Sequence, residues 1–279
     1  MTTLTLTRSA PVRTPRVLRH GTGVGTGIWR HARRYVSPVV LIVLWQAASS
    51  AGLLSARTLA SPSQILTTGW GLLISGELPW HLAVSLGRVT AGLAIGLTIG
   101  AALALAAGLS RLGEDLVDAP VQMLRTLPFL ALVPLFILWF GIGELPKIAL
   151  VALGTAFPFY LNLFAGIRAV DPRLVEMGRV FGLGRRGLIR HVILPGALPS
   201  ALVGLRFSLG VAWLSLVVAE QVNAGAGIGY LINDARDFLR TDVILVGLVL
   251  YALLGLGADL LVRVLERRAL AWRPTLVRA

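Results

Sequence analysis

The stretch DPRLVEMGRVFGLGRRGLIRHVILPGALPSAL, residues 171–202, is a polar and basic insertion between two of the most apolar segments of the chain. Asp171 followed by Pro172 is typical of a helix start, because Asp can cap the first backbone N–H groups and Pro fits the first helical position. Gly182 and Gly184 predict the end of this helix. The stretch therefore opens with a short helix that ends in a glycine turn.

A second short helix is expected from about residue 186 to 193, stopped by the proline two residues later. On the first helix, Leu174, Phe181 and either Met177 or Gly178 fall on one face and form an apolar ridge. The arginines give the loop a basic face. Either the ridge docks on a partner protein, or the loop lies on the membrane and binds anionic lipid. The residues alone leave both readings open.

The composition indicates a membrane protein. Of the 279 residues, 56% are hydrophobic and only 14% are charged, whereas soluble domains carry nearer a quarter charged residues. We therefore expect the lipid bilayer to surround most of the chain. The net charge is +13, but the basic residues lie in loops beside apolar runs, which is how membrane topology is encoded. No nucleic-acid partner is expected.

Several kinds of chemistry are excluded by the residues present. The chain contains no Cys, and its four His residues are scattered without metal-ligand spacing, so no metal site is expected. Its single Lys, Lys147, follows Pro146 and cannot belong to a GxxxxGK phosphate-binding loop. No cluster of carboxylates, or nucleophile with a base, lies at membrane depth. We therefore expect no catalytic residue and no cofactor on this chain, and any ATP to be bound by another subunit.

Six apolar segments of roughly 20 residues predict an all-α, polytopic membrane protein with about six transmembrane helices. Pro128 and Pro134 predict a kink in the third segment, and Pro158 predicts an interruption of the fourth. The segments are 36–55, 86–109, 121–142, 146–168, 200–222 and 243–265.

The distribution of arginine orients the chain. Arginines concentrate in residues 1–35, in the loop 168–199 and in the tail from residue 263. By the positive-inside rule all three are cytoplasmic, as are both termini. The N-terminal stretch, rich in Thr, Arg and Gly, is expected to be disordered. It is not expected to be a cleaved signal, because the apolar run after it has the full length of a span.

Small residues recur at every fourth position of the second segment, at Gly92, Gly96, Gly100, Ala104 and Gly108. Such a stripe lets helix backbones approach closely. Packing within the chain is the favoured interpretation, and a dimer interface is the alternative.

Most charged residues near the spans have structural interpretations. Arg88, Arg125 and Arg206 lie near span ends, where long side chains can reach water. Asp259 and Arg263 are four residues apart and are expected to pair. Glu220 lies close to the outer end of its span, where it could line the mouth of a pathway or pair across a dimer.

One further pattern resembles a known family. Glu176 is followed six residues later by Gly182, and twelve residues after that by Leu194-Pro195. This order and spacing resemble the EAA loop of the permease subunits of bacterial ABC importers. The pattern of that loop is Glu-Ala-Ala, then three residues, Gly, nine residues, Ile, one residue and Leu-Pro. The departures from that pattern are Met177, Gly178 and Val192.

The resemblance continues through residues 60–274. Three further stretches look like the branch of these permeases that imports aliphatic sulfonates, with taurine and nitrate relatives. They are RTLPFLALVPLFILWFGIGELPKIALVALGTAFPFYLNLFAGIRAVDP, LVVAEQVNAGAGIGYLINDARDFLRTDVI and ADLLVRVLERRALAWRP. This resemblance implies a type I importer permease fold in the bacterial inner membrane. The expected regions are an Arg-rich tail 1–35, a first helix and outer loop 36–79, a permease core 80–268 with the coupling loop 169–199, and a tail 269–279.

The resemblance also implies the partners: a second copy of the permease, two ATP-binding subunits and an extracytoplasmic binding protein. The loop would couple to the ATPases and swing the permease between inward- and outward-facing states. A salt bridge from Glu176 to Arg179 or Arg190 is the alternative role for that carboxylate. The residues expected to couple are Glu176, Gly178, Gly182, Arg185, Arg186, Leu194 and Pro195.

The substrate is expected to be a small organic anion. Either polar side chains near the middle of the membrane bind it, or it passes without a tight site while the binding protein supplies specificity; the second is favoured. A rival hypothesis, a self-sufficient secondary transporter, predicts no docking loop and usually an internal repeat. The candidate pathway residues are Thr155, Tyr160, Asn162, Ser208, Trp213, Ser215 and Glu220.

Overall fold

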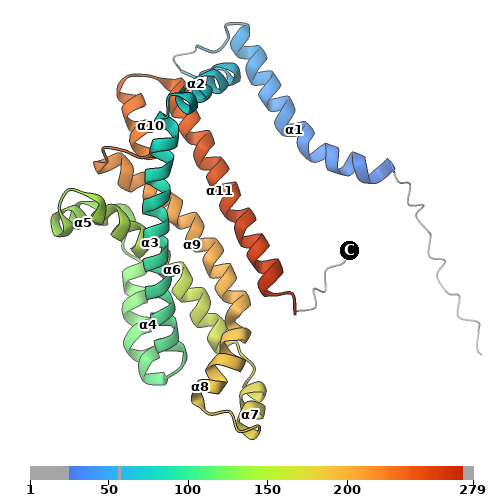
Figure 1. Ribbon diagram of the computed structural model, residues 1–279, viewed down its shortest axis with the longest axis vertical. Coiled ribbons are helices and arrows are strands. Elements are labelled where there is room, and N and C mark those ends of the chain that lie inside the picture. Colours follow the sequence, from blue (N-terminus) through green and yellow to red (C-terminus); the bar gives the residue numbers. More distant parts are fainter. Residues whose placement is uncertain (1–24, 56–57, 273–279) are drawn as a thin grey trace, which may run out of the picture. The chain divides into compact units, whose positions relative to one another are not determined.

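The computed structural model describes residues 25–55 and 58–272, and within them every regular element is a helix. The prediction of an all-α chain is therefore confirmed. The chain divides into two compact units, residues 1–47 and 48–279. Figure 1 shows the helices of the second unit gathered into a bundle of long rods with short helices at their ends.

The first unit contains most of α1 (Gly25–Ser50), a helix with Pro38 inside it. The part Val36–Ser50 is apolar but shorter than a full span. Helix α1 begins at Gly25, so residues 25–35 of the expected disordered tail are helical. The remainder of that tail, residues 1–24, and the last residues 273–279 lie outside the described residues.

Four helical runs among the described residues are long and apolar enough to cross a membrane. They correspond to the second, fourth, fifth and sixth apolar segments of the sequence. Shorter helices join them: α2 (Pro62–Ile74), α4 (Arg111–Arg125), α5 (Val133–Phe140) and α10 (Ile228–Asp237). The four runs are α3 (Glu77–Gly108), α6 (Glu144–Arg168), Arg185–Val222 and α11 (Thr241–Ala269).

The core of the bundle is α6, which packs along both α3 and α9 (Leu194–Asn223). The glycine stripe of α3 makes this contact. A Cβ added to Gly92 would lie 2.6 Å from the Cβ of Val151, and one added to Gly100 would lie 2.7 Å from the backbone oxygen of Ala156. The stripe thus packs within the chain, as favoured from the sequence, and it brings the two helix backbones together.

An ionic network joins α9 to α11. Arg206 contacts Glu266 at 2.9 Å and Asp259 at 3.3 Å, and Asp259 also contacts Arg263 at 2.8 Å. The predicted pairing of Asp259 with Arg263 is confirmed. All of these side chains are partly exposed, so each pair contributes little stability by itself.

The third apolar segment, 121–142, does not form the single kinked helix that was expected. Helix α4 ends at Arg125, a 3₁₀ turn η1 spans Phe129–Leu132, and α5 begins at Val133. Pro128 lies in the break between these helices. Pro134 lies in the first turn of α5, where a missing N–H costs nothing because that N–H would have no helical partner.

Two further prolines were expected to interrupt helices and do not. Pro158 lies inside α6, which is continuous because α3 and α9 hold it along its length. Pro195 lies in the first turn of α9, which follows α8 (Arg185–Leu188) and the π-helix η2 (Ile189–Ile193) without a gap. In a helix, the ring of a proline clashes with the carbonyl of the preceding turn. The π-helix has a wider turn, which leaves room for the ring of Pro195.

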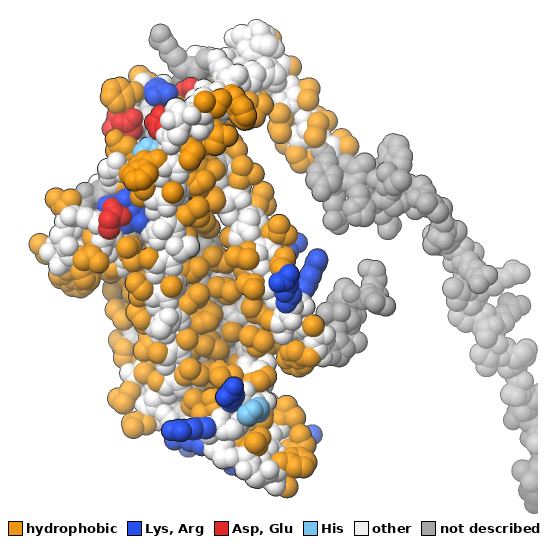
Figure 2. Space-filling view, in the orientation of Figure 1, with side chains coloured by type: hydrophobic (Ala, Val, Ile, Leu, Met, Phe, Trp, Pro, Cys, Tyr) orange, Lys and Arg blue, Asp and Glu red, His pale blue; other side chains and the backbone are white. Residues whose placement is uncertain are grey.

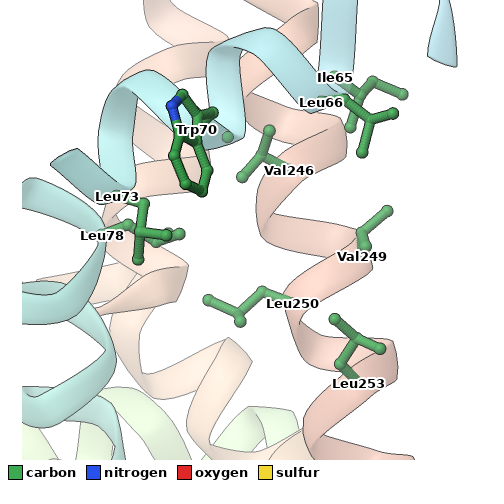
Figure 3. Close-up of a pocket in the computed structure, with 10 residues that line it drawn as sticks. Ile65, Leu66, Trp70, Leu73, Leu78, Val246, Val249, Leu250 and Leu253 are labelled. Carbon is green, nitrogen blue, oxygen red and sulfur yellow. The ribbon is translucent and has the colours of Figure 1, made fainter. Parts of the chain in front are cut away.

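Helices α2 and α11 enclose an apolar groove of about 260 Å³. Figure 3 shows Trp70 and Leu73 of α2 and Leu78 at the start of α3 on one side of this groove, and Val246, Val249 and Leu253 of α11 on the other. Such a lining is compatible with lipid acyl chains and offers them no polar group. The residues lining it are Ile65, Leu66, Gly69, Trp70, Leu73, Leu78, Val246, Val249, Leu250 and Leu253.

The tight contact of α3 with α6 makes a testable prediction. Gly100→Ala places a methyl group against the backbone oxygen of Ala156, which cannot move away without shifting α6. We expect a loss of about 1–3 kcal/mol of unfolding free energy, the usual cost of overpacking. Thermal or denaturant unfolding of the purified chain in detergent measures it.

Gly87→Ala is the matched control, because Gly87 lies in the same helix with nothing within 4 Å of an added Cβ. Equal stability of the two variants would contradict the proposed packing.

Candidate functional site

The basic loop folds as two short helices. Helix α7 (Pro172–Val180) is capped by Asp171, whose side chain accepts a hydrogen bond from the backbone N–H of Arg173 at 2.9 Å. Pro172 occupies the first turn, where no helical N–H bond is lost. The predicted helix start is therefore confirmed.

Gly182 reverses the chain after α7. It has φ of +79°, a left-handed conformation that glycine adopts without steric cost. Its N–H donates to the carbonyl of Arg179 at 2.9 Å, and the N–H of Leu183 donates to the carbonyl of Gly178 at 3.0 Å. This pair of bonds is the Schellman motif that ends many helices, and it turns the chain back so that α8 packs on α7.

Helices α7 and α8 approach each other closely at Gly178. A Cβ there would lie 2.7 Å from Cδ2 of Leu188, which is buried between the two helices. An alanine at this position, as in the EAA pattern, would need a small shift of the Leu188 side chain.

The outer surface of the loop is apolar and basic. Val180 and Phe181 are 86% and 79% exposed, and Leu174 and Met177 are about half exposed, so the predicted ridge is present and uncovered. Leu174, Met177 and Phe181 also line a groove of about 390 Å³, together with Pro195. Figure 2 shows basic side chains, which are arginines in this part of the chain, gathered at this end of the molecule.

The remaining coupling candidates lie around this ridge. Glu176, Arg185 and Arg186 are exposed, and Leu194 is 39% exposed. Among the described residues, Glu176 makes no ion pair, so the structure does not contain the alternative salt bridge to Arg179 or Arg190. Its carboxylate is left accessible to a partner. The coupling role of all seven residues stays a prediction.

Most of the candidate pathway residues are buried inside the chain. Several bind neighbouring helices or their own backbone: Tyr160 donates to Asp118 at 2.9 Å, and Ser208 donates to the carbonyl of Thr155 at 2.8 Å. Asn162 and Trp213 are partly accessible, so the pathway assignment, which stays a prediction, is favoured most at these two positions. The buried candidates are Thr155, Tyr160, Ser208, Ser215 and Glu220.

Glu220 lies in a buried charge cluster, defined here as His81, Ser85, Arg88, Glu144, Lys147 and Glu220. Neither expectation for Glu220, the mouth of a pathway or a pair across a dimer, anticipated its contacts. It is 1% exposed, and its carboxylate accepts from the guanidinium of Arg88 at 2.7 Å and from the hydroxyl of Ser85 at 2.8 Å. These bonds join the end of α9 to α3.

The same guanidinium extends the cluster to α6. Arg88 donates to both carboxylate oxygens of Glu144, at 2.5 and 2.7 Å, and Glu144 contacts Lys147 at 3.3 Å. Arg88 and Lys147 are 4% exposed, whereas the side chain of Glu144 is 57% exposed. A buried guanidinium needs such partners because unpaired charge is costly away from water.

The cluster also holds the first turn of α10. The N–H groups of Gly227, Ile228 and Gly229 donate to His81 Nδ1 at 3.0 Å, to the Ser85 hydroxyl at 2.9 Å and to Glu220 Oε2 at 2.8 Å. These are N–H groups that a helix start leaves without helical partners.

Sequence reasoning missed His81 and Ser85. The sequence does contain a pattern that indicates them: His81, Ser85 and Arg88 fall at i, i+4 and i+7, so their side chains share one helix face.

The cluster makes a prediction about stability. Glu220→Gln removes one charge of a fully buried ion pair and leaves the guanidinium of Arg88 without its buried counter-charge. We therefore expect the free energy of unfolding to fall by about 3–5 kcal/mol. Glu144→Gln is the matched control, because Glu144 binds the same guanidinium. Since the Glu144 side chain is exposed, this change should lower the free energy of unfolding by only about 1 kcal/mol. Denaturant unfolding of the purified variants in detergent compares them. Losses of equal size would show that burial of the Arg88–Glu220 pair is not what stabilises this end.

Comparison with known proteins places this geometry in a family. Residues 94–270 match the family described as binding-protein-dependent transport system inner membrane component. The chain is 55% identical to a protein of Escherichia coli (strain K12) provisionally named aliphatic sulfonates transport permease protein SsuC, over 85% of this chain and 90% of that one. It is 35% identical to the taurine transport system permease protein TauC of the same organism, over 84% and 86% of the two chains.

A solved structure has the same fold. The crystal structure of an amino acid ABC transporter with histidines aligns with 73% of this chain and 96% of its own, with a TM-score of 0.58 and 20% identity. The family match spans well over half of the chain, and the similarity to SsuC covers most of both proteins. The chain therefore belongs to the binding-protein-dependent transport system inner membrane components, the permease subunits of ABC importers.

Proposed function

We propose that this chain forms the translocation pathway of an ATP-driven importer and is not itself an enzyme. Two ATP-binding subunits and a soluble binding protein complete the transporter, and a second copy of this chain completes the pathway. The observation that carries the proposal is the loop at residues 171–195, whose uncovered apolar ridge and accessible Glu176 project from one end of the bundle. ATP is bound by the partners, and this chain holds no cofactor.

The loop is suited to transmit motion. Its turn is fixed by the two Schellman hydrogen bonds at Gly182, and its second helix continues through η2 into α9 as one helical run, Arg185–Val222. A displacement of the ridge by an ATPase is therefore passed through this hydrogen-bonded turn to the second helix, which continues into a span of the permease without a break. Arg185 and Arg186 begin this run and face the same partner.

The proposed orientation places this loop and both termini in the cytoplasm of a bacterium, with the chain in the inner membrane. It rests on the five arginines of residues 171–195, all of which are exposed, and on the positive-inside rule. The rival interpretation, a self-sufficient secondary transporter, gives the loop no partner and leaves its ridge unexplained.

The proposed substrate is an aliphatic sulfonate. The similarity to SsuC, at 55% identity, exceeds that to TauC, at 35%. Taurine, nitrate and other small anions remain the alternatives on the same scaffold. Asn162 and Trp213 are the proposed pathway contacts, and specificity is supplied mainly by the binding protein.

Growth on defined sulfur sources tests the substrate. A strain lacking this chain should fail to grow on ethanesulfonate as the only sulfur source, grow normally on sulfate, and recover on ethanesulfonate when the chain is restored. Taurine is tested in parallel as sulfur source and nitrate as nitrogen source. Normal growth on ethanesulfonate together with failure on taurine or nitrate would reassign the substrate.

Variants of the loop test the coupling. Glu176→Arg reverses an accessible carboxylate, and Gly182→Asp forces a side chain into a left-handed turn at a cost of about 1–2 kcal/mol. We expect both variants to reach the membrane but to reduce sulfonate uptake at least about tenfold, because a misplaced helix end can no longer follow the ATPase.

Gly184→Ala is the control, since a Cβ there meets nothing within 4 Å and its φ is −70°. Uptake and co-purification with the ATPase subunits are measured together. Normal uptake by both test variants would reject the coupling role of this loop.

A further inference from the structure

The third apolar segment of the sequence is broken at membrane depth. Helix α4 runs back along α3, and its Val121 packs in one core cluster with Ala104 of α3. The break between α4 and α5 begins at residue 126, five residues further along the chain, which is about 7 Å further into the bundle. It therefore lies beside the apolar length of α3 and not at a span end. Residues 126–128 of this break are exposed.

Irregular backbone at this depth does not face lipid, because lipid offers no partner for its polar groups. It is tolerated only where it is buried in protein or lines a water-filled cavity. Arg125, the last residue of α4, favours the cavity, because it is exposed and makes no ion pair with any described residue. An exposed charge at membrane depth needs water or a counter-charge. The side of the chain that carries α4 and α5 is therefore suited to the water of the pathway and not to lipid.

Helix α11 provides the contrast. It is continuous from Thr241 to Ala269, and only 17% of its apolar stretch is buried within the chain, the smallest share of the four spans. An unbroken helix satisfies its own backbone groups, so an apolar one suits lipid. Figure 1 shows α5 and α11 on opposite sides of the bundle. The chain thus has a side suited to lipid, which includes the groove of Figure 3, and a side suited to water.

A second apolar groove, of about 370 Å³, lies on the α5 side of the bundle, between α3, α5 and α6. Ile95 and Ile99 of α3 line it and are each about half exposed. Phe136 and Phe140 of α5 also line it, with their ring centroids 5.7 Å apart. Helix α6 adds three alanines, Ala149 among them, whose small side chains leave the space open. An apolar recess is thus present on the side suited to water.

The buried charge cluster lies at the outer end of this groove. Leu145 lines the groove and directly follows Glu144, the first residue of α6 and a member of the cluster. The two cations of the cluster are paired with its two carboxylates. The groove therefore offers a ligand apolar contact and no free positive charge.

We propose that this groove holds the alkyl tail of an aliphatic sulfonate during its passage, while the sulfonate head stays in the water of the pathway. Moving a charged head away from water is costly without a partner, whereas each buried methylene contributes about fourfold in affinity. The inference rests on the proposed function and adds a chain-length filter to it. The binding protein selects the anion, and the permease favours the longer tail.

Two other occupants of the groove are distinguishable from the tail. A lipid acyl chain would have to lie beside the exposed backbone of residues 126–128 and the charge of Arg125, which is unfavourable in lipid. Side chains of a second copy of this chain would cover the groove and leave no room for a tail. The alkyl tail is the occupant that suits both an apolar lining and a side facing water.

Filling the groove tests the proposal. Ala149→Phe places a bulky ring in the recess. The complete transporter is reconstituted in proteoliposomes with its binding protein, and ATP-driven uptake is measured from an equal mixture of hexanesulfonate and ethanesulfonate. We expect the ratio of hexanesulfonate to ethanesulfonate taken up to fall about tenfold from the wild-type ratio, because the longer tail loses the contacts of about two methylenes. The binding protein is the same in both preparations, so a change in this ratio arises in the permease.

Ala252→Phe is the matched control, because Ala252 is exposed on α11, on the side suited to lipid, and it should keep the wild-type ratio. Ile99→Ala is a second test variant that removes apolar contact without adding bulk. It should lower the ratio about fourfold, the equivalent of one methylene, even where Ala149→Phe does not fold.

A wild-type ratio in the groove variants, or an equal fall in the uptake of both sulfonates, would overturn the tail site while leaving the importer intact. No ATP-driven uptake of either sulfonate by the wild-type transporter would instead overturn the proposed function, and the tail site with it.

The absence of cysteine from the sequence provides a second measurement. Ile99→Cys carries the single thiol of this chain, in the groove. In lipid nanodiscs we expect it to react with a water-soluble, negatively charged thiol reagent, and hexanesulfonate should slow this reaction more than ethanesulfonate does. Spontaneous disulfide-linked dimers would place the second copy in the groove, and reaction only with a lipid-soluble reagent would place lipid there. Either result would overturn the proposal.

Discussion

The buried ion pair between Arg88 and Glu220 is the interaction on which this end of the fold depends. In a bilayer no water satisfies a polar group, so each must find its partner within the protein. Arg88 reaches α6 through Glu144 and α9 through Glu220, and Glu220 in turn fixes the first turn of α10. One guanidinium thus joins helices that are far apart in the sequence. Their relative positions can change only if this set of bonds moves as a unit or breaks.

The two ends of the bundle are mechanically connected through α9. At one end the helix continues into the basic loop, and at the other it carries Glu220. Along its length it packs on α6, which is itself locked to α3 by contacts that leave no room for a methyl group at Gly100. Close backbone packing of this kind favours rigid-body motion, because interdigitated surfaces do not deform continuously. A permease that alternates access by rocking whole helices fits these contacts better than one that bends them.

The sequence predicted the elements that depend on local chemistry. The cap at Asp171, the turn at Gly182, the Asp259–Arg263 pair and the glycine stripe all follow from neighbouring residues, and the structure has each of them. The prolines were misjudged at positions 158 and 195 because tertiary packing and a π-helix accommodate them. The partner of Glu220 lies 132 residues away on another helix, and no local pattern indicates such a contact. Five of the seven candidate pathway residues are buried within the chain for the same reason, since burial is decided by the neighbouring helices.

The charge balance of the buried cluster bears on how the proposed anionic substrate would cross the membrane. Its two cations, Arg88 and Lys147, are matched by two carboxylates, Glu144 and Glu220, so the cluster offers no unpaired positive charge. The hydroxyls of Thr155, Ser208 and Ser215 are likewise engaged by backbone carbonyls. An unpaired cation in a span would be costly, and it would also hold a sulfonate and slow its release. A cluster whose charges are paired in this way offers an anion no such binding site. This arrangement supports the proposal that the soluble partner selects the substrate, while the permease supplies a passage whose opening is driven from the coupling loop.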